Sequence, residues 1–246
     1  MWRATEDADT SRSSGDGPPD VGITAIRLRR PPLQEAIKRS LDVVLAGIVL
    51  AIVSPLFAAI AVLVVVDSPG PVFYRAERVG FRGRRLRMLK FRKMHAAARG
   101  PDLTLAGDER LTRVGAWLAR TKLDELPQLL HVLRGDMSLV GPRPEAPGFV
   151  ARYPAEYSVI LSTRPGLTGY TQLAFAREGS ILDPKDAYGH YVRALLPQKV
   201  ELDQLYATNR SIRRDLQILV ATFRTVILQE PVAVNRRTGE LTLRRR

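Results

Sequence analysis

The pattern of apolar and polar positions is dominated by one stretch, residues 43–66, which contains no charged residue. Asp42 and Asp67 bound this stretch on either side. As one continuous helix it would be about 36 Å long, which is enough to cross the hydrocarbon core of a bilayer. The pattern therefore predicts a membrane-associated helix.

Two features of the apolar stretch favour a hairpin that enters the membrane and turns back. Ser54-Pro55 lies at its midpoint, where proline removes a backbone donor and kinks a helix, and where the serine hydroxyl can help to satisfy the freed backbone groups. Both flanks are basic, with Lys38 and Arg39 before the stretch and an arginine-rich run after it. Positive residues favour the cytoplasmic side. We expect a re-entrant helix–break–helix, with a membrane-spanning helix and a buried helix of a soluble core as alternatives.

Downstream, the pattern predicts a small domain with short strands and amphipathic helices. Residues 72–74 are typical of a strand, residues 81–85 of a hairpin turn, and residues 111–118 of an amphipathic helix. Apolar side chains recur at helical spacing over residues 200–228, which predicts a long helix on the core or at the membrane interface. The predicted fold class is α+β, mainly α, with a re-entrant membrane hairpin and interfacial helices.

These patterns divide the chain into four parts. Residues 1–32 are polar and basic and are expected to be a disordered leader, since acidic residues are frequent and no secretory signal pattern appears. Residues 33–67 form the membrane hairpin and residues 68–230 the domain that carries the chemistry. Residues 231–246 form a basic tail, expected to be frayed from Asn235 onward.

Composition narrows the class of partner. The net charge of +13 implies an anionic partner: nucleic acid, anionic lipid or a phosphorylated small molecule. The absence of cysteine excludes disulfides and thiol chemistry, and the spacing of the three histidines argues against a zinc site. The basic residues are not interleaved with stacking aromatics, so we expect no nucleic-acid partner.

Two adjacent carboxylates within residues 120–144 are the strongest chemical candidates. Asp124 and Glu125 precede Pro127, and proline fits the first turn of a helix. The helix dipole, together with Arg120 and Lys122, is expected to favour the ionised carboxylates. The predicted helix carries an apolar stripe at Leu126, Leu130 and Leu133.

An ionised carboxylate can attack phosphorus as a nucleophile or ligate Mg²⁺ beside a phosphate. Taken alone, the pair Asp124 and Glu125 would more often be a helix cap. Arg143, held between two prolines, is a rigid anion-binding side chain, although it could also be part of a structural turn that faces solvent. Together, the two carboxylates, Arg143 and the predicted membrane segment indicate a reaction on a phosphate ester at a membrane surface.

Six motifs occur in an order that resembles a known family. They are Lys38-Arg39-Ser40-Leu41-Asp42, the apolar stretch with Ser54-Pro55, Lys90-Phe91-Arg92, Asp108-Glu109-Arg110-Leu111-Thr112-Arg113-Val114-Gly115, Asp124-Glu125-Leu126-Pro127-Gln128 and Met137-Ser138-Leu139-Val140-Gly141-Pro142-Arg143-Pro144. From about residue 38 to residue 228 the chain resembles the bacterial sugar transferases, that is, the monotopic polyprenyl-phosphate phosphoglycosyl transferases. Arg164-Pro165-Gly166-Leu167-Thr168-Gly169 matches the longer members of that family.

The resemblance implies an activity and a location. Such an enzyme transfers a sugar phosphate from a nucleoside diphosphate sugar, usually a UDP-sugar, to undecaprenyl phosphate and releases the nucleoside monophosphate. The product would begin the synthesis of an exopolysaccharide or glycoconjugate. The membrane element would be re-entrant in the inner membrane, with the catalytic domain facing the cytoplasm. The long C-terminal helix could mediate a homodimer.

The resemblance also implies residue roles. Asp124 matches the nucleophile that forms a phosphosugar–aspartyl intermediate, and Glu125 matches the acidic partner that binds Mg²⁺. Lys90, Arg92 and Arg143 match basic positions near the nucleotide or phosphates; they could instead face lipid. Arg120 is a further candidate for phosphate binding.

The chain departs from the family pattern in places. Lys122 stands where a small hydroxyl residue is common, which adds positive charge, and Tyr170-Thr171 replaces smaller residues. The extra N-terminal transmembrane helices of larger members are absent from this sequence, so we expect a catalytic-core form. Two other classes remain open: a membrane-tethered basic binding protein without catalysis, and a hydrolase that uses the same aspartate with water as acceptor.

Overall fold

The computed structural model describes residues 22–26, 31–98, 100, 103–105 and 107–243. Most of the predicted leader lies outside these residues. Its described part, residues 22–26, does not behave as a disordered segment: Ile26 donates its backbone N–H to Ser158 O at 2.8 Å, and Ile23 and Ala25 pack on a hydrophobic cluster. The leader therefore reaches the folded domain at this point.

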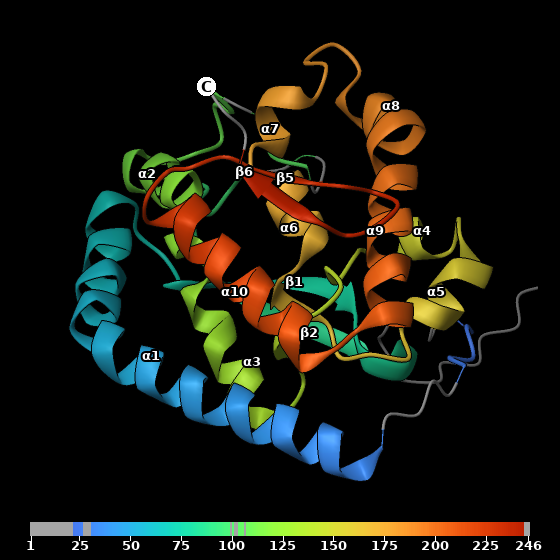
Figure 1. Cartoon of the computed structure of the whole chain (residues 1–246). Coiled ribbons are helices and arrows are strands. Elements are labelled where there is room, and N and C mark those ends of the chain that lie inside the picture. The colour runs from blue at the N-terminus through green and yellow to red at the C-terminus, as the bar shows by residue number, and fades with distance from the viewer. Residues whose placement is uncertain (1–21, 27–30, 99, 101–102, 106, 244–246) are drawn as a thin grey trace, which may run out of the picture.

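The apolar stretch is one helix, α1 (Pro32–Asp67), with Pro55 in its interior. Figure 1 shows that its two halves run in different directions along two sides of the molecule. Pro55 cannot donate to the carbonyl of Ala51, and Ser54 Oγ donates to that oxygen instead at 2.8 Å. The expectation that Ser54 would satisfy a freed backbone group is confirmed, although the helix bends rather than breaks.

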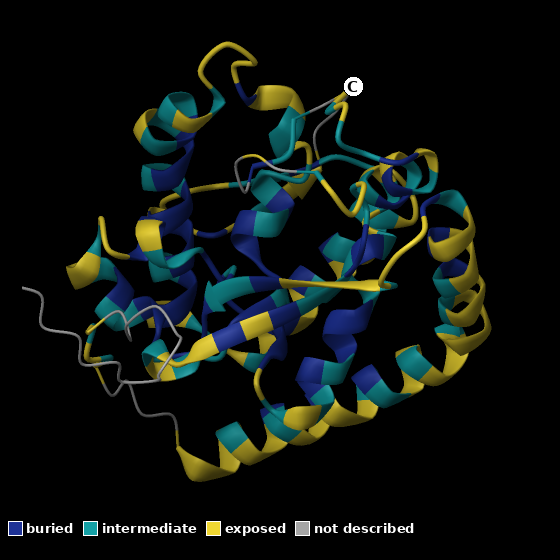
Figure 2. Ribbon diagram, turned by 180° about the vertical axis from the view of Figure 1, so that it is seen from behind, coloured by how far each residue is buried: buried dark blue, intermediate teal, exposed yellow. Residues whose placement is uncertain are grey.

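Most of α1 is exposed. Only 11% of its most apolar 18-residue window is buried, so the alternative of a buried helix in a soluble core is wrong. The buried positions form two groups, Lys38, Asp42 and Ala46 near the start and Ile60 and Val64 near the end. Figure 2 shows the exposed face as a continuous yellow edge along this helix. Such a large apolar surface is typical of contact with a membrane.

The first two strands form a hairpin. β1 (Phe73–Val79) pairs antiparallel with β2 (Arg85–Phe91), and Phe73 lies opposite Phe91. A 3₁₀ turn, η1 (Phe81–Gly83), joins them, which confirms the hairpin turn predicted at residues 81–85. β1 is longer than the predicted strand, since it continues through Arg75 as far as Val79 and buries Ala76 and Val79.

A second group of elements carries the carboxylate pair. α2 (Arg113–Thr121) is capped by Thr112, whose side chain accepts from Gly115 N. A 3₁₀ segment, η2 (Leu123–Gln128), follows and leads into α3 (Leu129–Arg134). The short parallel pair β3 (Ser138–Val140) and β4 (Gly166–Thr168) lies beyond. The predicted apolar stripe is confirmed in part: Leu126 and Leu133 pack half-buried on the main core, while the fully buried positions are Leu129 and Val132.

Small helices cover the other side. They are α4 (Pro147–Val150), α5 (Pro154–Ile160), α6 (Tyr170–Ala174), α7 (Glu178–Ile181) and α8 (Ala187–His190), with a π-helical turn, η3 (Tyr191–Leu195), after α8. The predicted long helix over residues 200–228 is two helices, α9 (Leu196–Asn209) and α10 (Ile212–Val226). The break occurs at Ser211, whose side chain accepts from Arg214 N at 3.2 Å and so caps α10.

The end of the described chain is folded. β5 (Val232–Val234) and β6 (Leu241–Leu243) form an antiparallel hairpin, so the expectation of a frayed end from Asn235 is wrong as far as Leu243. Val232 is buried in the main core, and Gly239 lies close against the ring of Tyr170. Figure 1 shows this hairpin in red over α6 and beside α10.

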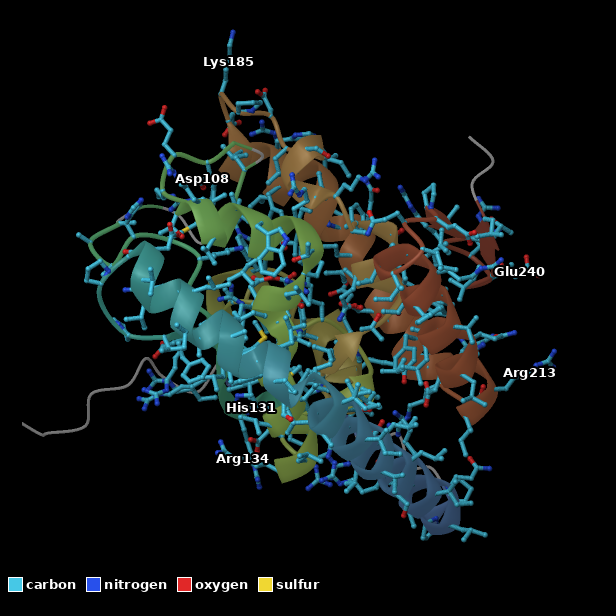
Figure 3. The ribbon with its side chains drawn as sticks, turned by 90° about the vertical axis from the view of Figure 1, so that its left-hand side faces the viewer. Asp108, His131, Arg134, Lys185, Arg213 and Glu240 are labelled. Carbon is cyan, nitrogen blue, oxygen red and sulfur yellow. The ribbon has the colours of Figure 1, made fainter. Side chains whose placement is uncertain are left out.

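Three hydrophobic clusters stabilise the domain, and the fold is α+β, mainly helical with short two-stranded sheets. His131, labelled on α3 in Figure 3, links two elements: its Nε2 accepts from Leu89 N at 3.2 Å, and its Nδ1 lies 3.1 Å from Asp136 Oδ2. Among the described residues no group of three histidine or carboxylate side chains could hold a metal on its own.

Candidate active site

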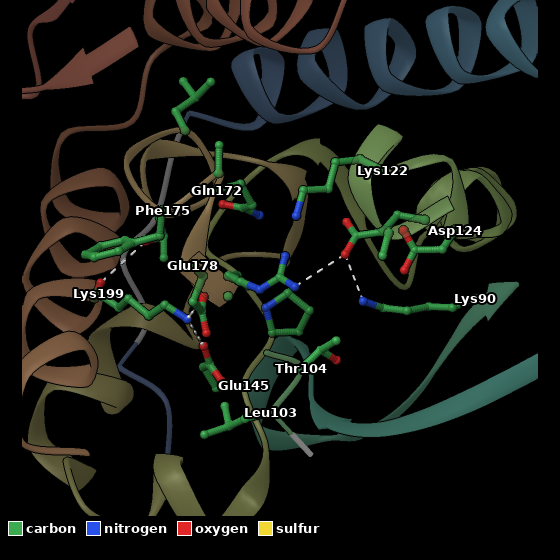
Figure 4. Close-up of a pocket in the computed structure, with 18 of the residues that line it drawn as sticks. Lys90, Leu103, Thr104, Lys122, Asp124, Glu145, Gln172, Phe175, Glu178 and Lys199 are labelled. Atoms are coloured by element: carbon green, nitrogen blue, oxygen red, sulfur yellow. Dashed lines mark hydrogen bonds and ion pairs between the residues drawn. The ribbon is translucent and has the colours of Figure 1, made fainter. Parts of the chain in front are cut away.

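A sharp reversal of the chain presents the two carboxylates. α2 ends at Lys122, which has a left-handed backbone (φ 62°, ψ 13°), and Glu125 N then donates to Lys122 O at 3.2 Å. This turn directs Asp124 and Glu125 into a cavity of about 220 Å³. Figure 4 shows Asp124 on one side of this cavity, which we call the catalytic cavity.

The end of β2 and the residues after it supply two lysines to these carboxylates. Lys90 Nζ lies 2.8 Å from Glu125 Oε1, and Lys93 Nζ lies 3.8 Å from Asp124 Oδ2. The backbone at Lys93 is fixed, since Lys93 O accepts from Thr112 N at 3.0 Å and packs against Gly115 so closely that a Cβ there would come within 1.8 Å. Gly115 therefore allows α2 and the Lys93 segment to meet behind the site.

The loop that carries Arg143 forms the facing wall. Arg143 Nη2 lies 3.3 Å from Glu125 Oε1, so this side chain faces the carboxylate pair. Asp203 on α9 holds the loop: its Oδ2 accepts from Arg143 N at 3.3 Å, and its Oδ1 accepts from Thr171 Oγ1 at 2.5 Å. The predicted rigid presentation of Arg143 thus has a physical support that lies 60 residues further along the chain.

The pKa values of the two carboxylates are shifted in opposite directions. Burial raises the pKa of Asp124, and Lys90 opposes that rise. Burial acts on Glu125 in the same direction, but Lys90 and Arg143 outweigh it, so the pKa of Glu125 lies well below its usual range. The expectation that both carboxyls are shifted towards ionisation is right for Glu125 and wrong for Asp124, because Asp124 is buried rather than exposed at a helix end.

A second charged group lines the far end of the catalytic cavity. Lys199 Nζ lies 2.7 Å from Glu178 Oε2 and 3.4 Å from Glu145 Oε1, and Tyr191 donates its hydroxyl to Glu145 at 2.9 Å. The pKa of Glu145 is lowered: burial would raise it, but Lys199, Arg143 and Arg78 together outweigh burial. No motif marked these residues, since they lie on separate elements and meet only in the fold.

The structure places two predicted phosphate-binding residues elsewhere. Arg92 is buried behind the site, where it donates to Pro69 O at 3.0 Å and to Ser68 O, and so holds the end of α1. Arg120 is exposed and lines a neighbouring cavity. The fold therefore brings Asp124, Glu125, Lys90 and Arg143 together and leaves these two arginines outside.

The residues present fit a Mg²⁺ ion that is completed by substrate. Asp124 and Glu125 both line the catalytic cavity and supply oxygen atoms, which is the donor type Mg²⁺ prefers. Within the described part of the chain, both ion pairs of Glu125 go to Oε1. One or two carboxylates together with substrate phosphates form a usual Mg²⁺ site.

Comparison with known proteins gives the family. The model of the bacterial sugar transferases matches residues 33–229. The UDP-glucose:undecaprenyl-phosphate glucose-1-phosphate transferase of Caulobacter vibrioides is 41% identical over 84% of this chain and 78% of its own length. The exopolysaccharide production protein ExoY of Rhizobium meliloti is 35% identical over 80% of this chain and 88% of its own.

Some relatives are much longer than this chain. The UDP-N-acetylgalactosamine-undecaprenyl-phosphate N-acetylgalactosaminephosphotransferase of Aeromonas hydrophila is 38% identical over 80% of this chain, and the match covers 45% of its length. The family match over residues 33–229 spans the carboxylate pair, the lysines around it and the Arg143 loop. On this match and on the geometry of the catalytic cavity, the chain belongs to the bacterial sugar transferase family.

Proposed function

We propose that this protein transfers a sugar phosphate from a UDP-sugar to undecaprenyl phosphate and so initiates exopolysaccharide or glycoconjugate synthesis. The observation that carries the proposal is the pair Asp124 and Glu125, held in one cavity by Lys90, Lys93 and Arg143. The relatives named as undecaprenyl-phosphate sugar phosphotransferases support the same substrates.

The proposed reaction has two displacements at phosphorus. A carboxylate oxygen of Asp124 attacks the β-phosphorus of the donor, the bond to the bridging oxygen breaks, and the nucleoside monophosphate leaves with the electron pair. A phosphate oxygen of undecaprenyl phosphate then attacks the same phosphorus, and the Asp124 carboxylate is regenerated. One phosphate site can thus serve both substrates in turn.

The surrounding cations would lower the cost of bringing anions together. Lys90 and Arg143 hold Glu125 beside Asp124, and Lys93 faces the attacking carboxylate. In this role Mg²⁺ would neutralise phosphate charge beside the carboxylates. Fixed cations of this kind stabilise a developing negative charge without reorganisation.

We propose that α1 is re-entrant in the inner membrane and that the catalytic cavity faces the cytoplasm. Support comes from the bend at Pro55, the exposed apolar face and the basic residues on both flanks. The exposed apolar residues of α10, namely Leu216, Val220 and Phe223, would rest at the interface of the same bilayer.

A hydrolase that uses Asp124 with water as acceptor is the second candidate function. The exposed apolar face of α1 favours a lipid acceptor over water, since it would hold the cavity at the membrane surface. The alternative of a binding protein without catalysis gives no role to the buried Asp124 carboxylate, which lies in a cavity with several cations.

The test uses purified protein with Mg²⁺, labelled UDP-sugars and undecaprenyl phosphate. We expect labelled lipid and UMP, and we expect Asp124→Asn to abolish both, because an amide cannot form the covalent bond. The exposed Asp183→Asn serves as the matched control and should keep full activity. Full activity in Asp124→Asn would show that the nucleophile is assigned wrongly, and sugar phosphate released to water would favour the hydrolase.

A further inference from the structure

A second cavity of about 390 Å³ lies beside the catalytic cavity, beneath the C-terminal hairpin. We call it the hairpin cavity. Its walls come from the end of α2, from α6 and α7, from the end of α10, and from the β5 segment. Its size lies within the usual range of small-molecule sites, about 300–1,000 Å³. None of the roles derived above for the transfer reaction uses this cavity.

The charge on its walls selects an anion. Four cations line it, namely Arg120, Lys122, Arg177 and Arg236, and none of their side chains makes a hydrogen bond or ion pair with another described residue. Its one lining carboxylate among the described residues, Glu230, is already paired with Arg224 at 2.9 Å. Arg120, Arg177 and Arg236 thus have no neutralising partner among the described residues, and Lys122 attracts Asp124 and Glu125 at longer range; four cations around one space favour a phosphorylated ligand.

Part of the wall of the hairpin cavity is apolar and suits an uncharged part of a ligand. Ile181, 45% exposed, lines the cavity together with Pro231 and the β5 residues Val232 and Val234. Apolar walls with a few charged groups at the edge are typical of sites for ligands that have a ring and a phosphate. A nucleotide has both parts, whereas a free phosphate or pyrophosphate would leave the apolar wall unused.

The two cavities are joined. Lys122, Leu173, Phe175 and Val226 are among the residues that line both of them. Figure 4 shows the Lys122 side chain extending into the catalytic cavity, which Asp124 also lines. A ligand with its phosphates at Lys122 can therefore present one phosphorus to Asp124 and extend its remainder below the hairpin.

The far end of the catalytic cavity is the wrong place for a nucleotide phosphate. Glu145 and Glu178 lie there, and Lys199 is already shared between them. Carboxylates repel phosphate but accept hydrogen bonds from hydroxyl groups. That end therefore suits a sugar, and the nucleotide must lie in the other direction.

We infer that the hairpin cavity binds the nucleoside monophosphate part of the donor, and that the C-terminal hairpin is a nucleotide-binding element. This inference rests on the proposed function for the identity of the donor. It adds Arg177 and Arg236 as nucleotide-binding residues. It also gives Lys122, which departs from the family pattern, a position beside the phosphate that leaves.

The test compares two neighbouring arginines of the hairpin in the full chain. Arg236 lines the cavity, and Arg237 is exposed beside it without lining it. We expect Arg236→Ala to weaken UDP binding, measured by calorimetry in detergent, about tenfold, or about 1.4 kcal/mol. Arg177→Ala, directly before α7, should do the same, and Arg237→Ala should bind within about twofold of the unmodified protein.

Each outcome decides the inference. Equal binding in Arg236→Ala and Arg237→Ala, or no UDP binding by the unmodified protein, would overturn it. An unchanged UDP affinity with a raised KM for undecaprenyl phosphate would assign the cavity to the acceptor. A thermal melt of each variant without ligand detects misfolding of the hairpin, and Arg177→Ala then decides because it lies on another element.

Direct binding also separates this inference from the proposed function. Suppose UDP binds and Arg236→Ala weakens it, but no labelled lipid forms. The transfer activity would then be wrong and the nucleotide site right. If transfer is normal but all three variants bind UDP equally well, the proposed function would be right and the nucleotide site in the hairpin cavity would be wrong.

Discussion

Asp203 influences the reaction centre through a backbone contact. Burial raises its pKa to about 7, although its hydrogen bond from Thr171 opposes the rise. Its other oxygen accepts from the backbone of Arg143, which faces Glu125. A carboxyl that titrates near neutral pH thus holds the loop that carries a cation of the site.

Asp203→Asn should flatten the pH dependence of stability. The pKa of Asp203 is higher in the folded chain than the unfolded value near 3.9, so the folded state binds more protons between these values and loses stability as pH rises from about 4 to 7. From pH 5 to 8 this amounts to at most about 3 kcal/mol, and Asn, which does not titrate, removes it.

Chemical unfolding in detergent at several pH values measures the difference. Glu201→Gln, exposed on the same helix, is the matched control and should leave the pH dependence of the unfolding free energy unchanged. Parallel curves for Asp203→Asn and the unmodified protein would contradict the prediction.

At the scale of elements, α1 differs from a simple membrane anchor. Its start is held by Arg39, which donates to Val132 O at 2.6 Å and to Leu133 O at 2.8 Å at the end of α3. Its end is held by Arg92. Both ends of the bent helix are thus tied to one folded domain, which supports a re-entrant placement over a spanning one.

Both ends of α1 should be reached from the same face of the membrane. The chain has no cysteine, so single cysteines introduced at the exposed positions Gln34 and Arg75 report without background. In inside-out vesicles both should react with an impermeant maleimide, and in right-side-out vesicles neither should. Reaction of one site in each preparation would show that α1 spans the bilayer.

Local chemistry made some elements predictable from the sequence. The turn at residues 81–85 and the Ser54-Pro55 bend depend on neighbouring residues, and both were predicted. The break at Ser211 was missed because apolar residues continue at helical spacing on both sides of it. The apolar residues Leu216, Val220 and Phe223 on α10 are exposed, so part of this spacing does not mark the buried face of the helix. The periodicity was real, but it did not distinguish one long helix from two.

The site was predictable in part for a related reason. Asp124 and Glu125 are adjacent in sequence, and the family motifs marked Lys90 and Arg143. Arg92 lies two residues from Lys90 on an extended segment, yet its side chain serves the end of α1 instead. Lys199 could not be found, since its partner Glu145 is 54 residues away.

At the scale of the whole molecule, a buried polar cluster joins α1 to the rest of the domain. Lys38 Nζ lies 2.6 Å from Asp42 Oδ1, 2.7 Å from Ser138 Oγ and 3.6 Å from Asp215 Oδ2. Asp42 also accepts from Leu139 N at 3.2 Å. One cation thus lies beside two buried carboxylates from distant parts of the chain, and Asp215 also accepts a hydrogen bond from the Tyr206 hydroxyl at 2.7 Å.

Lys38→Met should destabilise the whole fold. It leaves Asp42 and Asp215 buried without their shared cation, a change that costs about 3–5 kcal/mol in comparable buried pairs. The midpoint of urea unfolding in detergent should fall accordingly. Lys185→Met, at an exposed position, is the control for loss of charge. Equal midpoints for both variants would show that the cluster contributes little.

The attachment of α1 at both ends also constrains the lipid around it. A free transmembrane helix meets a bilayer of the wrong thickness by tilting. α1 packs through Ala46 on the main core and through Ile60 and Val64 on another cluster, so its tilt is fixed by the domain. In the proposed membrane placement, hydrophobic mismatch must therefore be absorbed by thinning or thickening of the surrounding leaflet rather than by movement of the protein.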